Sequence, residues 1–156
     1  MARTKTLDET YHSCMGKEHI IFLNEADQER ALTLMLNAVK DIESLKEITP
    51  LLERGKNHGL AWCLRYETIR QLVEGILLME QVQSENHQCL FAYLCANHPD
   101  WGIEWDTIEG MRQVRNRVHY DGLSVKEDTW IENKPLFELY TMTLIRILRE
   151  KLESCH

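Results

Sequence analysis

The sequence has no apolar run long enough to span a bilayer, which requires about 18–20 consecutive apolar residues. Its longest hydrophobic stretch near the start covers only residues 19–23. That stretch is too short for the core of a secretion signal, and no small-residue cleavage site follows it. From these absences we expect a cytoplasmic protein that makes no contact with a membrane.

The sequence also lacks paired cysteines. Its five cysteines are an odd number and include no Cys-x-x-Cys pair. This pattern is typical of free thiols in a reducing compartment. Three of them, Cys63, Cys89 and Cys95, lie in apolar stretches, where we expect small core side chains.

Several signatures of cofactor and metal chemistry are missing. The phosphate-loop and dinucleotide fingerprints do not occur, and neither does the Gly-x-Ser-x-Gly motif of many hydrolases. The terminal pairs His12-x-Cys14 and Cys155-His156 lack the paired spacing of a zinc site. We therefore expect no cofactor and no bound metal.

Prolines and glycines are scarce, with three and seven in 156 residues, while 44% of the residues are hydrophobic. That composition and length indicate one globular domain with a sizeable core. The net charge of −7 argues against broad electrostatic binding to nucleic acid. A focal basic site remains compatible with it, because residues 112–117 contain three arginines and no acidic residue.

Apolar residues recur at three- and four-residue spacing along most of the chain, and no segment alternates like a strand. In the segment 25–47 the repeating positions are Leu32, Met35, Leu36, Val39, Ile42 and Leu45. Further helices are expected over 60–85, from 87 to about 97, from 106 to 121 and from 134 onward. Thr49-Pro50 and Lys134-Pro135 are expected to end one helix and begin another. The sequence thus predicts an all-α bundle of about five helices in residues 19–156, preceded by a loose arm over 1–18.

The most unusual stretch is 111–122, which reads Met-Arg-Gln-Val-Arg-Asn-Arg-Val-His-Tyr-Asp-Gly. On a helix, Arg112, Arg115, Asn116 and His119 share one face. Arginine offers a planar, permanent cation for phosphate, and histidine moves protons near neutral pH. From the residues alone, a solvated face with Glu109 as the ion-pair partner of Arg112 is the favoured interpretation of this pattern.

The same stretch resembles the HEPN family of all-α, nucleotide-associated proteins. The resemblance covers most of residues 60–152 and has its centre at 114–122, with support from 65–77 and 84–90. The family motif is an arginine followed by a polar residue, and then a histidine after four to six residues. Many members resemble metal-independent endoribonucleases that act as homodimers, with two motifs meeting at the interface. Others bind nucleotides or pair with a nucleotidyltransferase in toxin–antitoxin systems.

Carried onto this chain, the resemblance implies catalytic roles for Arg112 and His119, which have the family spacing. Arg115 and Asn116 supply the typical dipeptide and would hold a phosphate. Tyr120, directly after the histidine, is a possible accessory residue. Two functions follow: a metal-independent endoribonuclease, or a non-catalytic module that binds RNA, a nucleotide or a partner protein.

Overall fold

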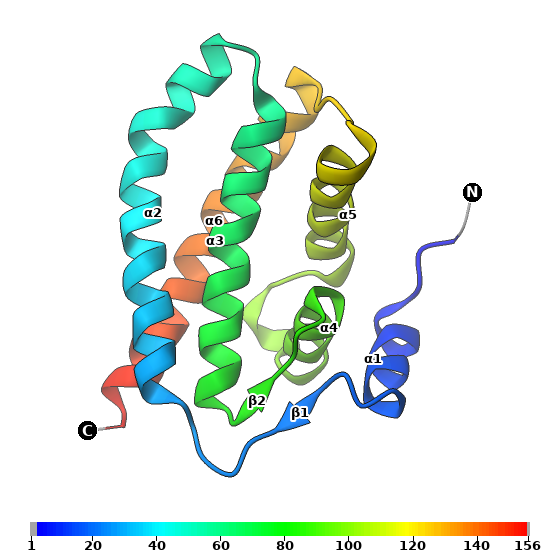
Figure 1. The fold of residues 1–156 in the computed structure, drawn as a ribbon, viewed down its shortest axis with the longest axis vertical. Coiled ribbons are helices and arrows are strands. Elements are labelled where there is room, and N and C mark those ends of the chain that lie inside the picture. Colours follow the sequence, from blue (N-terminus) through cyan, green and yellow to red (C-terminus); the bar gives the residue numbers. More distant parts are fainter. Residues whose placement is uncertain (1–2, 156) are drawn as a thin grey trace.

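The computed structural model describes residues 3–155, which form six α-helices, with α3 at the centre of the bundle (Figure 1). The all-α expectation is confirmed, with one helix more than the five expected. The helices are α1 (Leu7–Gly16), α2 (Gln28–Arg54), α3 (His58–Met79), α4 (His87–Asn97), α5 (Trp105–Asp121) and α6 (Glu127–Glu153). A 3₁₀ turn, Pro99–Trp101, follows α4. Two short strands that the sequence did not predict, β1 (Ile21–Phe22) and β2 (Val82–Gln83), pair antiparallel.

Helix α3 ends at Met79 rather than at 85, and it packs against α2, α4, α5 and α6. Most of its length is buried, including Trp62, whose ring meets Phe137 of α6 edge to face at 4.9 Å between centroids. There is no room for a side chain at Gly75, because an added Cβ would lie 2.8 Å from Leu148 Cδ2 and 3.5 Å from the Ala31 carbonyl oxygen. This glycine therefore allows α2, α3 and α6 to meet closely.

The buried face of α2 differs from the expected one. Leu45 is buried as predicted, but Leu32 and Leu36 are exposed. Small side chains face the core instead: Ala31, Ala38 and Thr49. Close contact with α3 favours these small residues, and the longer leucines turn to the outside.

Two prolines lie inside helices that they were expected to end or begin. Helix α2 continues through Pro50 to Arg54, and α6 begins at Glu127 and passes through Pro135. Both prolines are exposed. Each removes one helical hydrogen bond, but the carbonyls that lose it belong to the exposed residues Lys46 and Ile131. Water can replace the missing donor at both places, so the helices persist.

The N-terminal arm is not loose over residues 7–16. Thr6 caps α1 in a capping box with Glu9, and Trp105 Nε1 donates a hydrogen bond to the Lys5 carbonyl at 3.3 Å. A disulfide joins Cys14 of α1 to Cys89 in the first turn of α4. The expectation of free thiols is therefore wrong for these two cysteines. It holds for Cys63, Cys95 and Cys155.

Helix α5 ends as predicted, because Gly122 adopts the left-handed conformation with φ of 66°. Glu104 precedes the helix and provides no side-chain cap. Glu109, in the first half of the helix, is buried at 1% exposure. Across residues 3–155, none of the helices combines the length and apolarity needed to cross a membrane.

Candidate nucleotide-phosphate site

Helix α5 buries one side of its first half and leaves polar residues on the other. Ile108 and Met111 are fully buried, and Val114 and Val118 are half-buried. The polar side faces the start of α4 across a depression of about 330 Å³. We call this the α4–α5 depression; its lining residues are all polar, namely Glu85, Asn86, His87, Gln88, Arg112, Arg115, Asn116 and Tyr120.

Arg112 points into this depression but is already paired. Its Nε and Nη2 donate to the two carboxylate oxygens of Glu109 at 2.8 and 2.7 Å. Gln88 and Gln113 also donate to Glu109, at 2.8 and 3.2 Å. The bidentate hydrogen bonds to Glu109 raise the pKa of Arg112 above its ordinary value, so Arg112 stays charged. This charge neutralises the buried carboxylate of Glu109. The Arg112–Glu109 ion pair of the solvated-face interpretation is therefore present, but Glu109 is buried and does not lie on a solvated face.

Arg115, unlike Arg112, is not paired with a carboxylate in the described part of the chain. Its guanidinium carbon lies 5.6 Å from the centre of the Tyr66 ring, and its Nη1 donates to Asn116 Oδ1 at 3.0 Å. Within residues 3–155, the only side-chain hydrogen bond of Arg115 is with a neutral amide, so its positive charge has no carboxylate partner there. Tyr66 supports the planar group from below through a cation–π contact. Arg115 thus presents a fixed cation at the depression.

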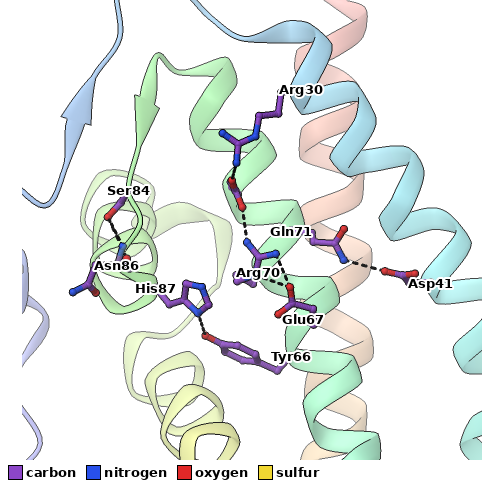
Figure 2. A network of polar contacts seen from close by, with 10 residues as sticks. Arg30, Asp41, Tyr66, Glu67, Arg70, Gln71, Ser84, Asn86 and His87 are labelled. Carbon is purple, nitrogen blue, oxygen red and sulfur yellow. Dashed lines mark hydrogen bonds and ion pairs between the residues drawn. The ribbon is translucent and has the colours of Figure 1, made fainter.

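His87 is the histidine of this depression. Its Nδ1 lies 3.2 Å from the Tyr66 hydroxyl, and Figure 2 shows the two side chains pointing toward each other from α4 and α3. Burial lowers the pKa of His87, and the positive charges of Arg70 and Arg115 lower it further against opposing Glu67 and Glu74. Burial also raises the pKa of Tyr66. At neutral pH these shifts keep the Tyr66 hydroxyl protonated and the His87 imidazole neutral.

The first turn of α4 adds donors to the same place. Asn86 caps the helix by accepting from the Cys89 amide at 3.0 Å, and Ser84 holds Asn86 through the contacts seen in Figure 2. The amides at the start of the helix carry partial positive charge and favour anions. Together with Arg115, this end of α4 forms a cradle suited to a phosphate.

On the other side of His87, the cations are neutralised by carboxylates. Arg70 donates to Glu67 at 2.9 Å and to Glu74, which also pairs with Arg30 of α2. Figure 2 shows Arg30, Arg70 and Glu67 one after another between α2 and α3. Because each arginine faces a carboxylate, this row stabilises the packing of α2 on α3 and offers little charge to an anion.

His119 does not line the same depression as Arg112. It is exposed and borders a second hollow of about 400 Å³ between α3 and α5, together with Gly59, Cys63 and Ser124. Tyr120 is 79% exposed at the rim of the α4–α5 depression. The fold therefore groups Arg112, Arg115, Asn116 and Tyr120 around one depression, and it places His119 at the adjacent hollow.

Two residues of the site had no clear sequence signal. His87 follows a capping asparagine, a position for which capping or solvent exposure is the ordinary expectation. Tyr66 lies in the middle of a buried helix, where an aromatic residue usually means core packing. Only the meeting of α3, α4 and α5 reveals their role. The sequence offered one weak signal, which is Tyr66 itself, because a buried tyrosine hydroxyl needs a hydrogen-bond partner.

Comparison with known proteins adds no relative: the chain matches no protein-family model, no curated protein and no solved structure.

Proposed function

We propose that this chain is a HEPN-like module that binds the phosphate of a nucleotide, free or within an RNA strand, in the α4–α5 depression. The observation that carries the proposal is Arg115, a cation without a carboxylate partner in the described part of the chain, held over Tyr66 beside the start of α4. Asn116 and His87 provide neutral donors around the same space. The volume of about 330 Å³ is within the range of small-molecule sites.

The charge distribution fits binding at one point rather than along a strand. The chain carries a net charge of −7, and Arg112, Arg70 and Arg30 are paired with carboxylates. One exposed phosphate contact gives a shallow salt dependence, since each phosphate contributes a slope of about −0.7 for single strands. We expect affinity for a nucleotide and for an RNA of mixed sequence to differ little.

Replacing Arg115 by glutamine is expected to weaken binding about tenfold, the usual size of a lost charge-assisted contact. Fluorescence anisotropy with a labelled RNA, and calorimetry with ATP, measure the two ligand forms separately. Arg117→Gln is the matched control, because Arg117 is exposed on the same helix and does not line the depression. Equal weakening by both variants, or an unmodified chain that binds neither ligand, would refute the site.

Cleavage of the bound RNA is a second candidate, favoured by the exposure of His119 one helical turn beyond Arg115. A strand held at Arg115 would need to cross into the neighbouring hollow, or meet His119 of a second copy, to reach the imidazole. His119 would then take the proton of a ribose 2′-hydroxyl. A nucleotidyltransferase partner stays a prediction of the resemblance.

The His119→Ala variant separates the two candidates. If the chain cleaves RNA, the variant is expected to lose at least about 100-fold in rate in EDTA while keeping its RNA affinity, because general acid–base groups contribute that much. His87→Ala tests the other histidine under the same conditions. Cleavage that is absent from the unmodified chain, or retained in His119→Ala, would remove His119 from the mechanism.

A further inference from the structure

Helix α6 has an apolar stripe that no other element covers. Ile131, Leu139 and Met142 are 58%, 56% and 70% exposed, and Pro135 is exposed between them. The opposite side of the helix is buried and packs mainly on α3. Four apolar residues in one stripe of a single helix exceed the scattered exposure usual on a monomer surface. This stripe is a candidate contact surface.

Charged residues at the two ends of the stripe have opposite signs. Asp128 is exposed near the start of α6, and Arg146 and Arg149 are exposed near its end. With 100° of rotation per residue, all members of the stripe lie within about 100° of arc. We call them the α6 outer face: Asp128, Ile131, Pro135, Glu138, Leu139, Met142, Arg146 and Arg149.

The α6 outer face is complementary to itself when the helix is turned end for end. About a point between 138 and 139, Asp128 falls opposite Arg149, and Pro135 falls opposite Met142. Ile131 falls opposite the aliphatic part of Arg146, whose own partner is the exposed Glu150 at 3.2 Å. Self-complementarity under a half-turn is the requirement for a two-fold contact.

We propose that a second copy of this chain docks antiparallel on the α6 outer face, across a two-fold axis beside Glu138 and Leu139. Leu139 and Met142 of both copies form the apolar centre, and Asp128 pairs with Arg149 of the other copy at each end. The contact extends over about 32 Å of helix. One helix pair buries less surface than a standard interface, so we expect a dimer of micromolar affinity.

Glu138 is the charge nearest the axis, where two copies would approach each other. Burial lowers the pKa of the nearby cation Arg65, and the carboxylates of Glu138 and Glu53 oppose this lowering. Arg65 is 7% exposed, and its Nε has no hydrogen-bond partner in the described chain. This buried positive charge offsets the repulsion between the two Glu138 side chains.

The apolar stripe lies on the side of α6 opposite its main contact with α3, whereas the α4–α5 depression lies between the start of α4 and α5. A dimer of this kind keeps its two depressions separate, so the inference does not depend on the proposed function. It also differs from a homodimer in which two Arg/His motifs meet in one cleft.

Sedimentation velocity over a concentration series tests the dimer and its register. Asp128→Arg is expected to raise the dimer dissociation constant about tenfold, because it faces Arg149 with a like charge twice in each dimer. Arg149→Asp should do the same. The double variant, Asp128→Arg with Arg149→Asp, restores opposite charges and should return the constant to within about threefold of the unmodified chain.

An exposed leucine on α2 provides the matched control. Leu139→Arg should leave the chain monomeric, whereas Leu36→Arg, at a site with similar exposure of 49%, should leave dimerisation unchanged. Three results would overturn the proposal: a monomer at all concentrations up to the millimolar range, dissociation by Leu36→Arg instead of Leu139→Arg, or a double variant no better than the single ones.

Discussion

Replacing Cys14 and Cys89 together by serine is expected to lower the free energy of unfolding by about 4 kcal/mol. The disulfide closes a long loop, since its cysteines are 75 residues apart in sequence, and opening that loop gives the unfolded chain more conformational freedom. For a domain of this size the loss corresponds to a fall of about 10 °C in Tm. Urea unfolding followed by circular dichroism measures it.

Reductant provides an internal control for this prediction. Dithiothreitol should destabilise the unmodified chain by the same amount and should leave the double serine variant unaffected. Cys155→Ser, which removes an exposed free thiol, should change stability by less than about 0.5 kcal/mol. An unmodified chain indifferent to reductant would show that the bond does not form or does not stabilise the fold.

Replacing Arg112 by alanine is expected to cost about 3 kcal/mol of stability, because it leaves the buried carboxylate of Glu109 without its cation. The cost lies at the lower end for a broken buried pair, since Gln88 and Gln113 still donate to Glu109. Thermal and urea unfolding give the difference. This result would distinguish the role of Arg112 from that of Arg115. Loss of Arg115 should weaken ligand binding and leave the stability of the fold nearly unchanged.

A second substitution shows whether the unpaired charge is the cause. Glu109→Gln in the Arg112→Ala background removes the carboxylate charge and should recover about 1–2 kcal/mol. Arg117→Ala is the surface control and should fall within about 0.5 kcal/mol of the unmodified chain. A double variant less stable than Arg112→Ala alone would contradict the buried-charge explanation.

The helical class and the course of α5 could be predicted from the sequence because local signals agree there. Ile108 and Met111 face the core, and Asp121-Gly122 ends the helix. Local spacing was enough for these two features. Helical geometry also predicts Arg112, Arg115, Asn116 and His119 on one face, but His119 borders the neighbouring hollow, and Tyr120 lines the depression with the other three.

Features that depend on tertiary contacts could not be predicted in this way. The pairing of Cys14 with Cys89 follows from the packing of α1 on α4, to which sequence spacing gives no guide. Likewise, Pro50 is tolerated within α2 because its side of the helix faces water. His87 belongs to the candidate site only because Tyr66 of α3 lies across from it.

The sequence separation of the two disulfide cysteines also determines the order in which the helices can pack during synthesis. Cys14 leaves the ribosome 75 residues before its partner, and at about 5–20 residues per second that interval is roughly 4–15 s. Strand Ile21–Phe22 can pair with Val82–Gln83 only after a stretch of chain of similar length has been synthesised. Helices α2 and α3 can pair during this interval, because only a short turn separates them. Residues 7–22 are thus made well before their partners in α4 and β2, and they are among the last of the described residues to reach their places.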